Sequence, residues 1–297
     1  MNLAARRQRH SPCIGVCKLD EASGLCLGCA RTGDEIGAWA GMGEAARDAI
    51  WQQLPERFKA LAVRVRLLPS TSDEIQAWVA KTIEQRQGTW VVGPPGAVAE
   101  FPCRPDRDIT VTIDEDGVTA RAPDAIFRLN ASDKLRAFAF DDDGPTVIGF
   151  PQVRATLSKV STVTSLGADY DAVDVDHRSE TLFDLGVDRR FSRFCVRTGN
   201  AELAAKLRGF IGQPWSAMMA GMGMDIIQHS PARVVETAQA RIEVFAPIPP
   251  PGGKSPDGAH THFLPQFLAT GEEIPSTLEL PSYAAPVAIF YPGKSPA

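Results

Sequence analysis

The sequence has no uncharged apolar run long enough to cross a lipid bilayer as a helix. Its basic first residues are not followed by the apolar segment of a secretory signal peptide. It also lacks a Ser-His-Asp order, the G-x-S-x-G and H-E-x-x-H motifs and the glycine fingerprint of dinucleotide-binding enzymes. We therefore expect a cytoplasmic protein with no membrane partner and with none of the common motif-bearing activities.

A strong basic bias is missing as well. Residues 1–69 carry ten Lys and Arg against seven Asp and Glu, whereas residues 70–297 carry 21 against 29. The only basic cluster near the start is Arg6, Arg7 and Arg9, and a solvated tail explains it better than a nucleic-acid-binding arm. With 297 residues, 44% of them hydrophobic, the chain is long enough for two domains that each bury a core.

What the sequence does contain is a group of four cysteines close to its start. Cys13, Cys17, Cys26 and Cys29 have the spacing C-x3-C-x8-C-x2-C. In a reducing cytoplasm such a group favours a shared metal over disulfides, because thiolates gather at short paired spacings to bind a cation or cluster. Four buried thiols without a ligand are the less common alternative. The sequence therefore predicts that these four cysteines hold one metal centre.

The cysteine spacing leaves the identity of the metal open. Four thiolates suit both a tetrahedral Zn²⁺ site and an all-cysteine iron–sulfur cluster. Leu27 and Gly28, between the last two cysteines, resemble the turns whose N–H groups point at sulfur in either kind of site. The spacing matches neither of the common ferredoxin patterns, which favours structural zinc slightly.

Helices are expected directly after the cysteines. Thr32 and Glu35 form a capping box that begins a short helix carrying Trp39. A second helix should begin near Glu44, and Pro55 should open a third as its first residue. So small a helical unit buries little apolar area, so we expect metal binding to contribute to its folding.

Residues 11–58 resemble a bacterial four-cysteine family of unknown function, family 1289, whose members are often labelled predicted iron–sulfur proteins. The resemblance covers about a fifth of the chain. It is carried by the four cysteines, Gly24-Leu25, Arg31-Thr32, Asp34-Glu35-Ile36, Trp39, Met42 and Leu54-Pro55. The resemblance implies the same four ligands and favours an iron–sulfur cluster. The cysteine spacing slightly favours zinc, so the two metals stay about equally favoured. The remainder of the chain is similar to an uncharacterised proteobacterial domain.

We divide the chain at residues 67–72, which read as a linker, into a helical metal-binding module, residues 1–68, and a larger domain, residues 69–297. Thr71 and Glu74 form a second capping box for a helix that ends before Gly88. Alternating apolar residues and turn signals then predict antiparallel strands at 90–92, 97–101, 109–113, 118–121, 126–129, 135–140, 153–166, 191–197, 233–237 and 241–246. Asn200 should cap a helix among the later strands. The fold class predicted is α+β with a mainly antiparallel sheet.

A second, weaker metal candidate is the pair His260 and His262. In an extended segment these imidazoles point the same way, and His229, His177 or Asp257 could complete a site. The alternative is a proline-stiffened surface loop whose histidines make ordinary hydrogen bonds. The pair fixes no third ligand by spacing, so both interpretations stay open.

Two further groups of residues have both a functional and a structural interpretation. Arg178, Arg189, Arg190, Arg193 and Arg197 could bind an anion, but the acids among them favour structural ion pairs. Cys103 and Cys195 have no activating neighbours in sequence, so we expect them to act as small apolar residues rather than nucleophiles.

The leading functional hypothesis is a non-catalytic metal-binding module fused to a domain that binds a partner protein or small ligand. One alternative is a metalloenzyme with its active site at His260 and His262. Another is a redox or iron sensor, in which the state of an exposed cluster changes contacts with a partner. Substrate, partner and oligomeric state do not follow from the sequence.

Overall fold

A computed structural model describes residues 11–13, 19–61, 66–68, 70–93, 97–140, 144–187, 189–249, 260–263, 280–281 and 283–293. Three features of the sequence analysis lie outside these ranges: the cluster Arg6, Arg7 and Arg9, the ligand candidate Cys17, and residues 250–259 before His260. Of His260 and His262 only the backbone is described. Among the described helices, none is long and apolar enough to cross a membrane.

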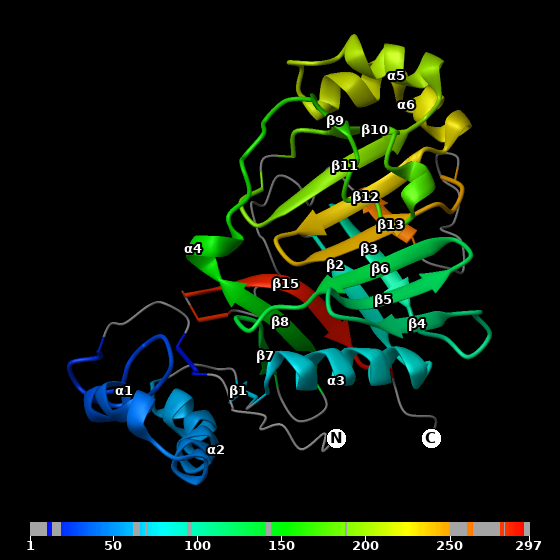
Figure 1. Ribbon diagram of the computed structural model, residues 1–297. Helices are drawn as coiled ribbons and strands as arrows, with labels where there is room; N and C mark the ends of the chain where they lie inside the picture. Colours follow the sequence, from blue (N-terminus) through cyan, green and yellow to red (C-terminus); the bar gives the residue numbers. More distant parts are fainter. Residues whose placement is uncertain are drawn as a thin grey trace.

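The described chain begins with helices and continues as an α+β region, which confirms the predicted fold class. The helices of the first part, shown in blue in Figure 1, pack at one side of the larger region. They are α1 (Gly33–Ala38), the short 3-10 helix η1 (Trp39–Gly41) and α2 (Glu44–Ala60). The later helices are α3 (Ser72–Glu84), α4 (Gln152–Ala155), η2 (Val175–His177), α5 (Ala201–Arg208) and α6 (Trp215–His229).

Two antiparallel sheets form the larger region. In spatial order, the seven-stranded sheet contains β1 (Arg66–Leu67), β7 (Arg136–Ala139), β8 (Thr146–Pro151), β15 (Ala284–Tyr291), β2 (Thr89–Val92), β3 (Ala97–Pro102) and β14 (His260–Phe263). The eight-stranded sheet contains β4 (Thr110–Ile113), β5 (Gly117–Ala122), β6 (Ala125–Asn130), β13 (Ala240–Val244), β12 (Ala232–Thr237), β11 (Ser192–Thr198), β10 (Thr181–Asp184) and β9 (Thr164–Ala168).

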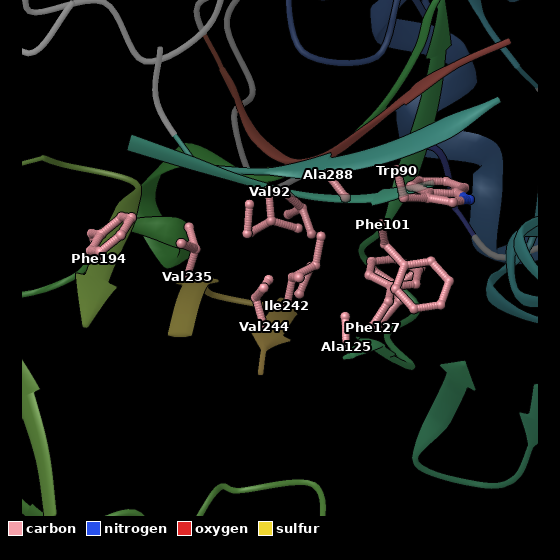
Figure 2. Close-up of a cluster of buried hydrophobic side chains, with 14 of the residues drawn as sticks. Trp90, Val92, Phe101, Ala125, Phe127, Phe194, Val235, Ile242, Val244 and Ala288 are labelled. Atoms are coloured by element: carbon pink, nitrogen blue, oxygen red, sulfur yellow. The ribbon is translucent and has the colours of Figure 1, made fainter. Parts of the chain in front are cut away.

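The main hydrophobic core lies between the two sheets. Figure 2 shows Trp90 and Val92 of β2 facing Phe127 of β6 and Ile242 of β13 across this layer. The rings of Trp90 and Phe127 are stacked with centroids 5.2 Å apart. Strands β2, β3 and β6 confirm the strands predicted at 90–92, 97–101 and 126–129, and every second residue of each contributes to this layer.

A second apolar cluster joins the first helices to the seven-stranded sheet. It contains Trp51, Leu54 and Phe58 of α2 together with Phe138 of β7 and Tyr283, which precedes β15. Strand β1 enters the same sheet by pairing with β7. The helical part therefore buries its apolar side against the sheet instead of closing a core of its own.

The prediction that Pro55 begins a third helix is wrong. Helix α2 runs without interruption from Glu44 to Ala60 and contains Pro55. A proline in this position cannot donate to the carbonyl one turn earlier and usually costs about 3 kcal/mol. Burial of Trp51, Leu54 and Phe58 on either side of it offsets that cost.

The strand predicted at residues 153–166 is also wrong for most of its length. Helix α4 and an irregular segment occupy residues 152–163, and only Thr164–Ala168 forms a strand, β9. β-Branched residues in that segment lack a sustained alternation, so composition alone was a poor guide. Among the strands that were not predicted are β8 and β15, inside the seven-stranded sheet, and β10, inside the eight-stranded sheet.

Candidate metal centre

The last two cysteines of the group lie on a tight turn. The N–H groups of Cys29 and Ala30 both donate to the carbonyl of Cys26, at 3.2 and 2.6 Å, and the N–H of Cys26 donates to the carbonyl of Arg31. Ala30 has φ of +54°, a left-handed conformation that non-glycine residues rarely adopt. The turn therefore holds the side chains of Cys26 and Cys29 on a constrained backbone, and both are buried.

Helix α1 begins directly after this turn and is held to α2 by hydrogen bonds. Thr32 forms the predicted capping box with Glu35, and the Glu35 carboxylate also accepts two hydrogen bonds from Arg57 of α2, at 2.5 and 2.8 Å. Arg57 donates in addition to the carbonyl of Ala30. The guanidinium of Arg57 accordingly lowers the pKa of Glu35, and the pair ties the cysteine turn to both helices.

Arg31 makes the most direct polar contact with a cysteine. Its Nε donates to the sulfur of Cys29 at 3.4 Å, and its guanidinium lies 4.5 Å from the ring centroid of Trp39. Only 2% of Arg31 is exposed, yet its Nη1 has no hydrogen-bond partner among the described residues. Burial raises the pKa of the Cys29 thiol to about 11, and Arg31 acts in the opposite direction.

Arg136, a side chain of the larger region, lies near the same cysteines. Arg136 of β7 is buried and donates to the carbonyl of Ser11 at 2.7 Å, which brings the start of the described chain onto the sheet. Burial lowers the pKa of Arg136 to about 10, while the charges of Asp133, Cys13 and Cys29 raise it. Cys13 and Cys29 therefore lie within electrostatic reach of one guanidinium.

Tyr283, which precedes β15, also lies near the cysteines. Burial, followed by the charges of Cys29 and Cys26, raises the pKa of its hydroxyl. Its ring packs against Phe58 of α2 with centroids 6.3 Å apart. The three described cysteines thus share one neighbourhood, which is bounded by Arg31 of the helical part and by Arg136 and Tyr283 of the sheet.

Several polar atoms in this neighbourhood are buried without a hydrogen-bond partner among the described residues. They are Nη1 of Arg31, Nε1 of Trp51, Nε of Arg136 and Oη of Tyr283. Trp51 lies beside Arg136, whose guanidinium is 5.8 Å from its ring centroid. Buried donors without acceptors are rare in folded proteins, so their accumulation here calls for an acceptor such as a thiolate or an inorganic sulfide.

The described residues alone do not form a metal site. Among them, no three His, Cys, Asp or Glu side chains are arranged so that they could bind one metal ion. Cys13, Cys26 and Cys29 are thiols, and Cys17, the fourth expected ligand, is not among the described residues. The four-cysteine site remains a prediction that the surrounding donors fit chemically.

Comparison with known families gives two matches. A family of unknown function, DUF6925, matches residues 74–297, which is most of the chain. The chain belongs to this family. A second family, a protein of unknown function called DUF1289, matches residues 11–58 and confirms the resemblance and its bounds. No curated protein and no solved structure matches the chain.

Arg136 and Tyr283 belong to the DUF6925 region, and sequence reasoning missed both of them. No local pattern identifies them, because they come next to the cysteines only through the pairing of β7, β8 and β15. Arg31 lies two residues after Cys29 and is buried. From the sequence it was identified only as one of the residues that carry the family resemblance. A basic residue so close to two cysteines was the one signal that could have identified it.

The other candidate residues are not brought to this centre. Backbone pairing of β14 with β3 places His260 opposite Glu100 and His262 opposite Val98, so the extended backbone expected there is present. Of the proposed additional ligands, His177 Nδ1 lies 3.1 Å from Glu180, and His229 Nδ1 lies 2.9 Å from the carbonyl of Asp225. A metal site at His260 and His262 remains a prediction.

Two of the five arginines considered as an anion site, Arg193 and Arg197, form ion pairs in the DUF6925 region. Arg197 is fully buried and contacts Glu243 at 2.6 Å and Asp169 at 3.0 Å. Arg193 contacts Asp184 at 3.0 Å and Glu236 at 3.1 Å. For these two residues the preference for ion pairing over an anion site is confirmed.

Cys103 and Cys195 lie in apolar surroundings. Both are buried, and burial raises the pKa of Cys103 to about 12 and that of Cys195 well above its usual value. A reactive cysteine needs a lowered pKa and access to a reagent, and neither residue has them. Their expected role as small apolar residues is consistent with this environment.

Proposed function

We propose that Cys13, Cys17, Cys26 and Cys29 together bind one zinc ion or one iron–sulfur cluster, and that the DUF6925 region encloses this centre with Arg136 and Tyr283. The protein is then a metal-binding protein whose larger domain binds a partner or small ligand. Its location in the cytoplasm, where thiols stay reduced, is part of the same proposal.

The observation that carries the proposal is the set of buried donors around the cysteines. A divalent metal held by four thiolates has a net charge of about −2. Arg31 and Arg136 are buried, and no carboxylate among the described residues forms an ion pair with either of them. Two buried cations that form no ion pair among the described residues are costly by themselves but compensate such an anionic centre.

The donor set also supplies hydrogen bonds to sulfur. The bond from Arg31 to Cys29 already has this form, and the partnerless groups of Trp51 and Tyr283 lie in the same neighbourhood. Donors to ligating thiolates set the stability of a zinc site and the potential of an iron–sulfur cluster. The same residues fit either group, so the metal is identified by experiment.

Single Cys→Ser substitutions test the four-ligand site, with Cys103→Ala and Cys195→Ala as matched controls that remove a thiol elsewhere. Each of the four Cys→Ser variants should bind less metal and lose thermal stability in the helical part, since a missing thiolate removes binding energy that supports folding. The controls should keep their metal. Elemental analysis of the purified variants decides, and full metal retention by any one of the four sinks the claim.

A sensing role is a second candidate, favoured by the position of the centre between two parts of the chain. Phe58 and Tyr283 join the helical part to the sheet beside the cysteines. A change in the centre would therefore alter a packed interface. If the protein is a sensor, exposure to air should change both its metal content and its oligomeric state, whereas indifference to oxygen counts against this role.

The metalloenzyme alternative rests on His260 and His262 alone. His260→Ala combined with His262→Ala should leave the metal content unchanged if the cysteines hold the only metal. Loss of a second metal equivalent in that double variant would instead favour the enzyme hypothesis.

A further inference from the structure

An apolar cavity lies far from the cysteines, in the DUF6925 region. Its volume is about 250 Å³, and it is enclosed by α6, by strands β11 and β12, and by the segment after β13. Helix α6 is the yellow helix at the upper end of Figure 1. Most of its wall is aliphatic, aromatic or thioether surface, including Phe194, Val196, Met218, Met219, Ile226 and Ile248.

One charged side chain lies in this apolar wall. Arg233 of β12 is only 5% exposed. It donates to the carbonyls of Pro231, at 2.9 Å, and Ala246, and its Nε is 3.5 Å from the hydroxyl of Thr261, which also lines the cavity. A guanidinium has five N–H groups, so two remain without a partner among the described residues.

No carboxylate among the described residues forms an ion pair with Arg233. Burial lowers its pKa to about 10, and no charged group among the described residues opposes that effect. Two other buried arginines on the same sheet do form ion pairs: Arg197 and Arg241 each contact both Asp169 and Glu243. Buried arginines are ordinarily paired because an isolated buried charge is costly.

We propose that this cavity binds a small amphiphilic carboxylate, with an aliphatic chain in the apolar part and the carboxylate on Arg233. A cavity of about 150 Å³ lined by aliphatic residues suffices for benzene, so 250 Å³ accommodates a chain of about eight carbons. A single guanidinium matches a carboxylate better than a doubly charged phosphate group, which normally recruits several cations. The hydroxyl of Thr261 completes the polar end of the site.

This site is independent of the proposed metal centre. Its residues come mainly from the eight-stranded sheet, α6, the segment after β13 and β14, whereas the cysteines lie near Arg136 of β7 and Tyr283. Failure of one proposal therefore leaves the other standing.

Calorimetric titration of the full chain with octanoate, and with octan-1-ol as the uncharged analogue, tests the proposal. Octanoate should bind in the micromolar range, and octan-1-ol should bind at least about tenfold more weakly because it forfeits the charge-assisted contact. Equal affinity for the two ligands overturns the role of Arg233. No binding of any carboxylate from six to twelve carbons overturns the site itself.

Two pairs of variants locate the binding site. Met219→Trp fills the cavity and should abolish octanoate binding, whereas Met224→Trp, on the same helix but 67% exposed, should leave it unchanged. Arg233→Met should reduce octanoate affinity about tenfold or more with little effect on octan-1-ol. If Arg233→Met does not fold, the Met219 and Met224 pair decides, and octanoate binding by Met219→Trp contradicts the proposal.

Discussion

At the scale of single residues, the buried arginines fall into two groups, those that form ion pairs with carboxylates among the described residues and those that do not. Arg197 and Arg241 are matched by carboxylates, so that although burial alone would raise the pKa of Glu243, the guanidiniums of Arg241 and Arg197 lower it. Arg31, Arg136 and Arg233 are also buried, but none of them forms an ion pair with a carboxylate among the described residues. Both proposed sites follow from this contrast, since each supplies the negative charge that the second group of arginines lacks.

The role of Arg136 can be tested by Arg136→Met. Loss of this cation should lower metal affinity about 10- to 100-fold, the usual effect of removing a group that supports metal ligands. Competition with a chelator measures the change. Arg121→Met, at a partly exposed ion pair with Asp174, is the control and should retain normal affinity. Unchanged affinity in Arg136→Met would show that Arg136 serves packing alone.

The raised pKa of Asp184 predicts that the unfolding free energy depends on pH. Burial raises its pKa to about 6, although the N–H of Gly186 and Arg193 oppose the shift. The folded chain then holds a proton between about pH 4 and 6 that the unfolded chain releases, so the unfolding free energy falls as the pH rises through this window. The slope from this group is at most about 1.4 kcal/mol per pH unit.

Urea unfolding at several pH values checks this prediction. Asp184→Asn should remove the slope, while Asp106→Asn, whose carboxylate is 76% exposed, should keep it. The same slope in Asp184→Asn and in the unmodified protein would assign the effect to another group.

Residue-scale features were predictable from sequence where the chemistry is local. The capping boxes at Thr32 and Thr71 and the cap at Asn200 occur as predicted, because each depends on side chains three residues from their partners. The fit of Arg136 and Tyr283 to the cysteines could not be predicted. It depends on strand pairing between segments more than a hundred residues apart.

At the scale of elements, most strands with alternating apolar residues were predictable. Strand β15 was not, because its sequence AAPVAIFY contains Pro286, and a proline normally argues against a central strand. The sheet accommodates it by an irregular register between Pro286 and Ala288 opposite β8. A rule about local hydrogen bonding was thus overridden at a bulge.

In helix α2, too, packing overrides a local rule about hydrogen bonding. Pro55 interrupts the hydrogen bonding of α2, and packing against the sheet compensates. Pro55→Ala should therefore raise the unfolding free energy by about 1–3 kcal/mol. The exposed neighbouring substitution Gln52→Ala should change it by less than about 0.5 kcal/mol. Urea unfolding followed by tryptophan fluorescence compares them, and a loss of stability in Pro55→Ala would mean that its ring contributes essential packing.

At the scale of the whole molecule, the helical part and the sheet share one apolar cluster, with the cysteines beside it. The division into residues 1–68 and 69–297 stays a prediction, and β1 crosses near that boundary to pair with β7. Because Phe58, Trp51 and Tyr283 connect both parts, the state of the centre and the stability of the sheet should be coupled. Sequence reasoning identified the two regions but not their shared interface.

The central claim is that the four cysteines hold one metal centre, and the most direct test is the visible absorption spectrum and elemental content of the full chain purified without oxygen. We expect bound metal in near-stoichiometric amount: iron with sulfide in a brown protein, or one zinc in a colourless one. A folded chain without metal, in which all four thiols react with a thiol reagent, would contradict it.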